Sequence, residues 1–337
     1  MSHEPVRIGL IGAGAIAQTY LQAFKAINEV QLAAVVDVRP QVAAATAEAF
    51  NCASFTSYRE LADANLCDAV IICTPPDTHP DITAWFLERG INVLCEKPLA
   101  IGPEQARTMF EAAANSTAML TMASKFRYVD DVIRAKSLID SGLIGDVILF
   151  ENAFTARVDM HKRWNADPVV SGGGVLIDNG THSVDIMRYF LGPLKEIQVI
   201  EGKRVQDIPV EDTVRMYVRS QSGVMGTVDL SWSINKELPH YISVYGSEGA
   251  IVVGWKQSKY RRAADKEWTV FGNGYDKVQA FSSQLKNFAA GIRGVEPLRI
   301  TLRDALASVE VIDKAYEAME TSRWLSVEPH LSDLVPA

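Results

Sequence analysis

The chain has 337 residues, of which 48% are hydrophobic and 22% are charged. This length and composition are typical of a globular protein with two domains and exclude wholesale disorder. The 33 basic and 41 acidic side chains give a net charge of −8, which argues against nucleic acid or an anionic membrane as a partner. We find no signal-peptide pattern and no membrane-length apolar run, so we expect a cytoplasmic protein.

The cysteines and histidines do not show a metal-ligand pattern. The six histidines form no His-x-x-x-His pair, and the four cysteines have no Cys-x-x-Cys spacing. We therefore expect no metal site and free, buried thiols in a reducing compartment. The cysteines are Cys52, Cys67, Cys73 and Cys95.

The first 125 residues alternate between short apolar runs and helical periodicity. Repeated strand–helix alternation indicates βαβ units and a parallel sheet covered on both faces. We therefore predict a Rossmann-type, doubly wound α/β domain at residues 1–125. The expected strands are 6–11, 32–36, 69–73, 92–95 and 119–123, and the expected helices end near 27 and span 40–50, 81–89 and 102–115.

From residue 126 onward the pattern changes to strict apolar–polar alternation between a few helices. Such alternation, with a hairpin turn at Gly246–Gly249, is typical of an antiparallel sheet with one buried face. We predict an α+β domain at residues 126–337 with a large, mostly antiparallel open sheet. Its small, polar second face would suit either solvent or a partner subunit. The expected helices are 131–139, 175–190, 276–292 and 301–320, and the expected strands are 147–152, 213–219, 224–234, 241–245 and 250–253.

A glycine motif follows the first predicted strand directly and opens the first helix. In this G-x-G-x-x-A pattern, Gly12 allows a tight turn, Gly14 allows the backbone to approach a pyrophosphate, and Ala17 keeps helix and strand close. The N–H groups at the helix N-terminus would face the phosphates. Glycines also occur as plain turn residues, but the strand before and the helix after favour a dinucleotide site that includes Ala15 and Ile16.

An acidic residue ends the second predicted strand. Asp37 lies where a carboxylate accepts hydrogen bonds from an adenosine ribose, and its charge would repel a 2′-phosphate. The sequence therefore favours NAD over NADP. Arg39 weakens this preference because its charge could offset a phosphate, and Asp37 could instead simply begin a turn.

Two further segments carry side chains suited to catalysis. Lys97 leaves the carboxyl end of a predicted parallel strand, where ligands of such sheets bind, although its side chain could equally extend to solvent. Asp178 and His182 are four residues apart and share one face of a predicted helix. An acid that orients a histidine can move a proton at physiological pH. The alternative is a pair that only stabilises the helix.

Five motifs follow one another along the chain: G-A-G-A-I-A at 12–17, T-P-P-D-T-H at 74–79, E-K-P at 96–98, F-R-Y at 126–128, and G-G-G-V-L-I-D-N-G-T-H at 172–182. With this set the sequence resembles the glucose–fructose oxidoreductase/inositol dehydrogenase (Gfo/Idh/MocA) family over nearly the whole chain. The resemblance implies that Lys97, Asp178 and His182 form the catalytic group. It also implies that Thr74, Pro75, His79, Glu96 and Lys97 line the nicotinamide half of the cofactor cleft. Asp77 departs from the asparagine of many members.

The family pattern implies hydride transfer between a sugar or cyclitol carbon and the nicotinamide. His182 would then take the hydroxyl proton, Lys97 would hydrogen-bond the same oxygen, and Asp178 would position the substrate or His182. The resemblance further implies a homodimer or homotetramer joined through the C-terminal sheet.

A basic and aromatic cluster precedes the glycine run and bears on the substrate. Arg157, Lys162, Arg163 and Trp164, together with Arg127 of the F-R-Y motif, could hold a phosphate, a carboxylate or a nucleotide diphosphate. The substrate could therefore be a free, phosphorylated or nucleotide-linked sugar or polyol. The alternative is a solvated loop in which Asp159 and Asp167 are the partners of the basic side chains.

Two other functions stay open beside the dehydrogenase. The first is a redox-neutral enzyme that retains NAD, as a glycosidase or sugar–sugar oxidoreductase does. The second is a dinucleotide-binding sensor without chemistry, which the presence of Lys97 and His182 disfavours.

Overall fold

The computed structural model describes residues 4–327 and divides into two compact units. The first unit contains the chain up to Lys125 together with Lys277–Leu306. The second contains Phe126–Asp276 and the described residues after Leu306.

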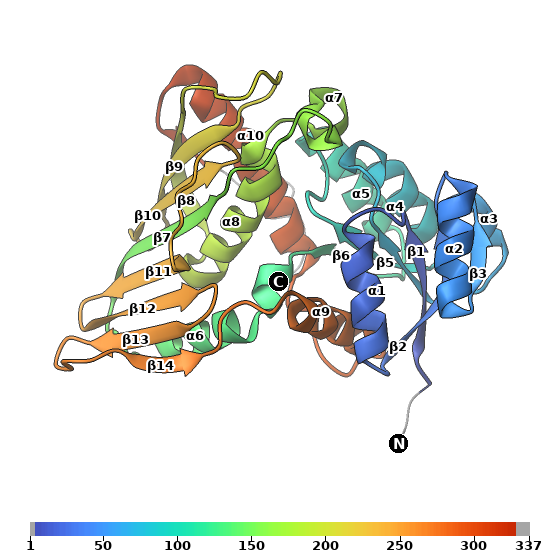
Figure 1. Cartoon of the computed structure of the whole chain (residues 1–337), viewed down its shortest axis with the longest axis horizontal. Helices are drawn as coiled ribbons and strands as arrows, with labels where there is room; N and C mark the ends of the chain where they lie inside the picture. Colours follow the sequence, from blue (N-terminus) through green and yellow to red (C-terminus); the bar gives the residue numbers. More distant parts are fainter. Residues whose placement is uncertain (1–3, 328–337) are drawn as a thin grey trace. The chain divides into compact units, whose positions relative to one another are not determined.

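The first unit is built on a six-stranded, fully parallel sheet of order β3-β2-β1-β4-β5-β6. The central strands are largely apolar and buried, as in the fully buried Ala69–Ile72, because helices cover both faces. Figure 1 labels these elements. The strands are β1 Val6–Ile11, β2 Val30–Val36, β3 Ala53–Phe55, β4 Ala69–Ile72, β5 Asn92–Glu96 and β6 Leu120–Ala123. The helices of the same region are α1 Ala17–Ala26, α2 Pro40–Phe50, α3 Tyr58–Asp63, α4 His79–Leu87 and α5 Pro103–Ala114, with short 3-10 turns η1 Pro76–Thr78 and η2 Lys125–Tyr128.

One helix of the first unit comes from much later in the chain. Helix α9 (Lys277–Ile292) packs on α1, and Phe281, Leu285 and Phe288 share a buried core with Tyr20. The sequence interpretation placed residues 277–306 in the second domain, and the structure differs there. The spacing of apolar residues predicted this helix correctly, but spacing alone does not say which sheet the apolar face covers.

The strand order places β1 and β4 side by side at the centre of the sheet, while the chain continues outward in opposite directions from them. In open α/β sheets, ligands bind at the carboxyl ends of the strands at such a reversal point. Gly12 and Thr74 follow shortly after these two ends.

The second unit contains a nine-stranded sheet of order β14-β13-β12-β11-β7-β10-β9-β8-β15. All neighbouring pairs are antiparallel except β7 and β10, which run parallel. The sheet is therefore mixed and largely antiparallel, as predicted. The strands are β7 Val147–Thr155, β8 Leu194–Glu201, β9 Thr213–Ser220, β10 Met225–Ser231, β11 His240–Gly246, β12 Gly249–Gly254, β13 Ser258–Arg262, β14 Thr269–Gly272 and β15 Leu325–Ser326.

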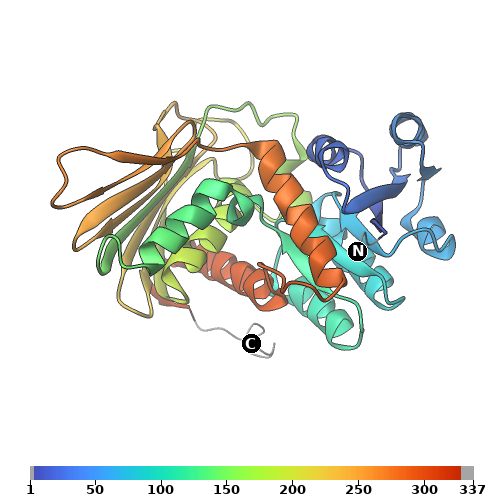
Figure 2. The same cartoon turned by 90° about the horizontal axis from the view of Figure 1, so that it is seen from below.

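Helices cover one face of this sheet. Helix α8 (Val175–Leu191) packs on β7, β9 and β10, and α6 (Asp130–Asp140) packs on β12 and β14. Helix α10 (Leu302–Thr321) lies beside α8, and Figure 2 shows the three helices on one side of the sheet. A 3-10 turn, η3 Trp164–Ala166, and α7 (Pro168–Ser171) precede α8.

The predicted elements are present, with boundaries that differ by a few residues. The sequence patterns did not predict β3, α3, α7, β8, β13, β14 and β15. The two helices in this list have six and four residues, and its strands lie at or next to an edge of their sheets. Except for β8, which has eight residues and buries Ile197 and Val199, these strands have five residues or fewer, too few to show a clear alternation.

Three chemical features of the described chain bear on function. Cys67, Cys73 and Cys95 are buried free thiols, and Cys52 is half-buried. Within residues 4–327, no cluster of three or more potential ligand side chains could hold a metal ion. No helix in this same range is long and apolar enough to cross a bilayer.

Candidate active site

The glycine motif after β1 has two glycines with different surroundings. Gly12 has a φ of +87°, and an added Cβ would lie 2.9 Å from the backbone carbonyl carbon and oxygen of Cys73. Gly12 is therefore needed for the close approach of the β1 turn to the end of β4. An added Cβ at Gly14 would meet nothing within 4 Å, so this position faces open space, as a phosphate-binding turn requires.

The N-terminus of α1 is not capped by a side chain. The N-cap position is Ile16, whose side chain accepts no hydrogen bond, and the first turn contains no acidic residue. Ala15 is exposed, Ile16 is half-buried, and Ala17 is fully buried against the sheet. The N–H groups and the positive end of the helix dipole therefore remain suited to an anionic ligand.

Asp37 lies beside the glycine turn at the end of β2. One oxygen, Oδ2, accepts the N–H of Ala13 at 3.0 Å and an Arg39 side-chain N–H at 3.0 Å. The other, Oδ1, accepts the Arg39 backbone N–H and Nε, each at 2.9 Å. These hydrogen bonds, chiefly those of the Arg39 guanidinium, lower the pKa of Asp37 to about 2. Asp37 is therefore a carboxylate at neutral pH, and the Arg39 guanidinium is hydrogen-bonded to both of its oxygens.

His79 ties the ends of two neighbouring strands together. Its ring is 1% exposed, with Nδ1 3.0 Å from the Pro98 carbonyl oxygen and Nε2 3.0 Å from the Thr74 carbonyl oxygen. Burial lowers the pKa of His79, which favours the neutral ring and so one donated bond at a time. His79 therefore holds the segment after β4, with Thr74 and Pro75, against the segment after β5.

Glu96 at the end of β5 belongs to a buried polar network. Its Oε1 accepts the Tyr20 hydroxyl at 2.8 Å, and the Tyr20 oxygen accepts the Gln284 amide at 2.9 Å. Its Oε2 accepts the Lys97 backbone N–H at 3.2 Å. Burial raises the pKa of Glu96, against the opposing effect of Tyr20. Lys97 itself is half-buried, and the bond from Lys97 to Pro98 is cis.

In the second unit, α8 carries Asp178 in its first turn and His182 one turn later. Asp178 is half-buried and His182 is 7% exposed. The His182 ring packs edge-on against Phe126, with centroids 5.0 Å apart, and near Phe154 at 6.4 Å. Both side chains lie on one helix face, as predicted, and aromatic packing restricts the orientation of the imidazole.

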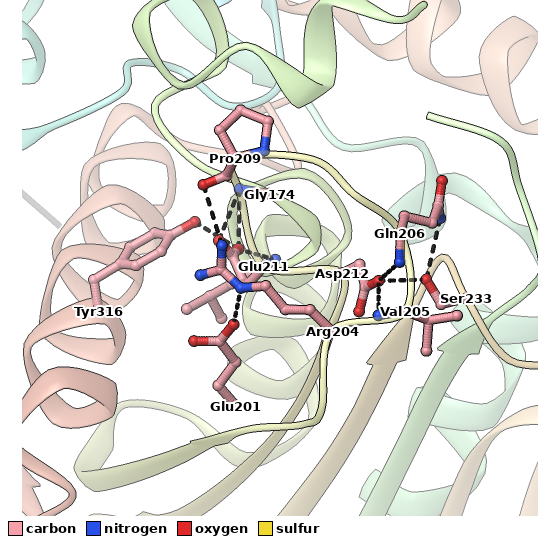
Figure 3. Close-up of polar contacts among 11 residues, drawn as sticks. Gly174, Glu201, Arg204, Val205, Gln206, Pro209, Glu211, Asp212, Ser233 and Tyr316 are labelled. Carbon is pink, nitrogen blue, oxygen red and sulfur yellow. Dashed lines mark hydrogen bonds and ion pairs between the residues drawn. The ribbon is translucent and has the colours of Figure 1, made fainter. Parts of the chain in front are cut away.

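The start of α8 is held by a residue from a distant loop. The Glu211 carboxyl accepts the Gly174 N–H at 3.0 and 3.1 Å, the Leu176 N–H at 2.9 Å, and the Tyr316 hydroxyl at 2.9 Å. The Glu211 carbonyl oxygen also accepts the Val175 N–H at 3.0 Å. Figure 3 shows Glu211 between Gly174 and Tyr316.

This contact explains two of the three glycines before α8. An added Cβ would lie 2.0 Å from the Glu211 carbonyl oxygen at Gly174, and 1.9 Å from the Tyr316 hydroxyl at Gly173. Gly172 has a φ of +80° and ends α7 in the left-handed conformation. The glycine run therefore allows close packing within the second unit.

Arg127 is buried in the second unit, where its side chain forms an ion pair. Its guanidinium forms an ion pair with Asp185 of α8 at 2.7 Å, and its carbon lies 5.3 Å from the centre of the Tyr189 ring. The side chain is only 6% exposed. Its predicted contact with substrate stays a prediction, while the ion pair shows that it holds α8.

The basic cluster at Arg157–Trp164 is exposed. Among residues 4–327, no ion pair forms with Arg157, Lys162 or Arg163, and Trp164 is 44% exposed. The carboxylates expected as partners have other contacts. Asp159 lies 2.7 Å from His161, and Asp167 accepts the Val169 N–H at the start of α7.

Sequence reasoning missed the residues that hold the predicted site residues in place. Tyr20 and Gln284 support Glu96, and Glu211 and Tyr316 support α8. These partners are 35 to 264 residues apart in the chain, so no local spacing indicates them. The acidic pair Glu211-Asp212 before an alternating strand was the one visible signal.

The first unit has the strand order, the glycine turn, the uncapped helix and the carboxylate at the end of β2 that define a dinucleotide-binding Rossmann domain. A model described as "Oxidoreductase family, NAD-binding Rossmann fold" matches residues 6–124, and the Gfo/Idh/MocA C-terminal domain matches residues 132–252. The chain belongs to the Gfo/Idh/MocA family of oxidoreductases, which confirms the resemblance.

Individual relatives match nearly the full length. Inositol 2-dehydrogenase of Rhizobium meliloti (strain 1021) is 28% identical over 342 residues, covering 96% of this chain and 99% of that protein. The structure of levoglucosan dehydrogenase in complex with NADH has a TM-score of 0.90 at 20% identity, covering 96% of this chain and 99% of that chain. The WlbA dehydrogenase from Bordetella pertussis in complex with NADH and UDP-GlcNAcA has a TM-score of 0.85 at 19% identity, covering 98% and 100%. These two structures share the fold of this chain.

Proposed function

We propose that the protein is an NAD-dependent dehydrogenase that oxidises a secondary hydroxyl of a sugar or cyclitol. The observation that carries this proposal is the fit of the first unit to a dinucleotide. Gly14 faces open space, the first turn of α1 is uncapped, and an ionised Asp37 lies beside them. The names of the relatives, an inositol and a levoglucosan dehydrogenase, support the substrate class.

The chain's own residues supply proton transfer and orientation. NAD, when bound, accepts the hydride. We assign the hydroxyl proton to the His182 imidazole, which is held by Phe126 and supported by its place on α8. Lys97 hydrogen-bonds the reacting oxygen and stabilises its developing negative charge. Asp178, one helical turn before His182, orients either the substrate or the histidine.

The cofactor preference follows from the contacts of Asp37. The carboxylate suits the ribose hydroxyls of NAD, and its charge opposes the 2′-phosphate of NADP. Arg39 already makes three of the bonds to Asp37, so its charge is directed to that carboxylate. The residues of this cofactor site in our proposal are Gly12, Gly14, Ala15, Ile16, Ala17, Asp37, Arg39, Thr74, Pro75, His79, Glu96 and Lys97.

The exposed segment Arg157–Trp164 supports a substrate that carries an anionic or nucleotide group. Its cations have no ion-pair partner among the described residues, and Trp164 offers a surface for stacking. The WlbA structure contains UDP-GlcNAcA, so a nucleotide-linked sugar belongs in the substrate panel beside inositols and free sugars.

The test is a panel of inositols, free sugars, sugar phosphates and nucleotide sugars with NAD, monitored by NADH absorbance. We expect turnover with at least one class, a loss of about 100-fold or more in kcat for His182→Ala, and full activity for the matched variant His240→Asn. Activity of His182→Ala equal to that of wild type would remove the proton-transfer assignment. Product formation without free NADH would instead indicate a redox-neutral cycle.

A further inference from the structure

The loop between β8 and β9, residues 202–212, forms side-chain hydrogen bonds with three separate parts of the second unit. It contains no helix or strand, yet its side chains reach the start of α8, the segment before α7 and the end of β10. Glu211 and Asp212 are 4% and 0% exposed. Burying two adjacent acids is costly unless hydrogen bonds compensate for it. Both oxygens of Glu211 and the Oδ2 of Asp212 accept such bonds, whereas the Oδ1 of Asp212 has no hydrogen-bond partner among the described residues.

Glu211 provides the cap that α8 lacks. The N-cap residue Gly174 has no side chain, and no side-chain cap from the local sequence is present. Glu211 supplies two carboxyl oxygens and one carbonyl oxygen to the N–H groups of three successive residues, Gly174, Val175 and Leu176. These bonds fix the register and direction of the turn that carries Asp178.

Asp212 holds the loop and Gln206 within it. Its Oδ2 accepts the N–H groups of Val205 and Gln206, each at 2.9 Å, and the Ser233 hydroxyl at 2.7 Å. Its carbonyl oxygen accepts the Trp232 N–H at 2.8 Å. Figure 3 shows the contacts of the Asp212 side chain with Val205, Gln206 and Ser233 beside those of Glu211.

Gln206 in turn is hydrogen-bonded to the backbone of the exposed basic segment Arg157–Trp164. Its Oε1 accepts the Met160 N–H at 2.9 Å, and its Nε2 donates to the Val158 carbonyl oxygen at 3.0 Å. The same amide group bonds the Ser233 hydroxyl at 3.1 Å. Residues 158 and 160 are thereby fixed inside the segment Arg157–Trp164, although that segment is otherwise a surface loop.

We propose that the Glu211-Asp212 dipeptide is a positioning element that sets two parts of the substrate site at once. Glu211 fixes the start of α8, and Asp212, through Gln206, fixes the segment Arg157–Trp164. Neither acid contacts the reacting atoms in this proposal. The link to catalysis rests on the proposed roles of Asp178, His182 and the basic segment, whereas the positioning itself rests on the hydrogen bonds.

The test compares Glu211→Gln with Gln206→Leu by hydrogen exchange and by kinetics on the full chain. Glu211→Gln keeps the side-chain shape but puts an amide opposite backbone N–H groups, so exchange should rise in the peptide 172–182. Gln206→Leu should raise exchange in the peptide 157–164. Glu201→Gln, which removes the half-buried acid that pairs with the exposed Arg204 in the same region, is the matched control and should change neither peptide.

The kinetic arms separate positioning from general destabilisation. Glu211→Gln should lower kcat about tenfold with KM changed by less than about twofold, because misplacing a catalytic group affects the chemical step. Gln206→Leu should raise KM about threefold or more while retaining kcat. If Glu211→Gln does not fold, Glu211→Asp keeps the charge at shorter reach and should give the same pattern more weakly.

Two results would overturn the proposal. One is unchanged exchange at 172–182 in the Glu211 variants, and the other is an equal response of both peptides to both variants. Failure of the proposed function would look different. A wild type without turnover on the whole panel would remove the enzymatic assignment, while the exchange data would still decide the positioning.

Discussion

At the scale of single residues, the two glycines of the dinucleotide turn have separable roles. Gly14 faces open space, so Gly14→Val should fold with an unchanged melting temperature and yet lose NAD binding, since the new side chain occupies the pyrophosphate position. Gly12→Ala should be destabilised, because its Cβ would meet the Cys73 backbone at 2.9 Å in a left-handed conformation. Titration calorimetry measures NAD binding by Gly14→Val, and thermal unfolding measures the stability of both variants. NAD binding by Gly14→Val at wild-type affinity would exclude this cofactor site.

The charges of Asp37 and Arg39 allow us to predict how substitutions there change the preference between NAD and NADP. Asp37→Ser removes the negative charge but leaves Arg39, so kcat/KM for NADP should rise and that for NAD should fall, each by about tenfold. The control, Arg39→Leu, should retain NAD and lose any activity with NADP. If the ratio of kcat/KM for NAD to that for NADP is the same in Asp37→Ser and Arg39→Leu, residues other than Asp37 and Arg39 determine the cofactor preference.

The depressed pKa of Asp37 also predicts a pH window. The ordinary value of 3.8 falls to about 2 in the folded protein, so the contribution of this carboxylate to stability is present above about pH 4 and is lost as the pH falls towards 2. Arg39→Leu should therefore be slightly less stable than wild type at neutral pH, and the difference should shrink below pH 4. Urea unfolding across this range measures it, and a difference that grows on acidification would contradict the assignment.

At the scale of elements, the contact between α1, α9 and the end of β5 depends on Tyr20. Burial raises the pKa of Glu96 above 4.5, so the folded state binds this proton more tightly, and stability falls as the pH rises through the window above 4.5. The Tyr20 hydroxyl opposes the raised pKa, so Tyr20→Phe should raise it further. The melting temperature of Tyr20→Phe should therefore fall further below that of wild type at about pH 8 than at about pH 5. An equal decrease at the two pH values would show that Glu96 does not titrate between them.

The buried ion pair of the second unit makes α8 sensitive to charge. Arg127→Leu leaves Asp185 buried without this guanidinium and should cost about 3–5 kcal/mol of unfolding free energy. The double variant Arg127→Leu with Asp185→Leu should recover part of that loss, because neither charge of this pair then remains buried. Denaturant unfolding of the single and double variants tests this, and strictly additive losses would argue against a direct interaction.

These elements also show which parts of the molecule a sequence can predict. The glycine motif, the apolar strands and the Asp178–His182 spacing are local patterns, and the structure contains them where they were expected. The caps and supports are not local: Glu211 reaches α8 across 35 residues, and Gln284 reaches Tyr20 across 264. A helix that lacks its own cap does not indicate which distant residue supplies one. The predicted association of Lys97 with Asp178 and His182 stays a prediction.

At the scale of the whole molecule, the second unit has a sheet face that suits association with another copy. On β10, outward residues such as Met225 and Thr227 alternate with buried ones, and Met225 is 53% exposed. We expect a homodimer or homotetramer through this face. Thr227→Arg should then give a smaller particle in light scattering, whereas Gln41→Arg on the exposed side of α2 should not. An unchanged mass for Thr227→Arg would exclude this face.

The placement of α9 has a consequence for how the protein is made. Within the described residues, the chain passes between the two units three times, after residues 125, 276 and 306. The core of the first unit needs Phe281, Leu285 and Phe288, so the emerging N-terminal part must wait for most of the chain to be synthesised. During that interval the apolar surface that α9 later covers is exposed to solvent, and such exposed surface makes incomplete domains prone to aggregation. A ribosome-bound nascent chain stalled at residue 125 should therefore be a strong chaperone client, and one extended beyond residue 306 should not.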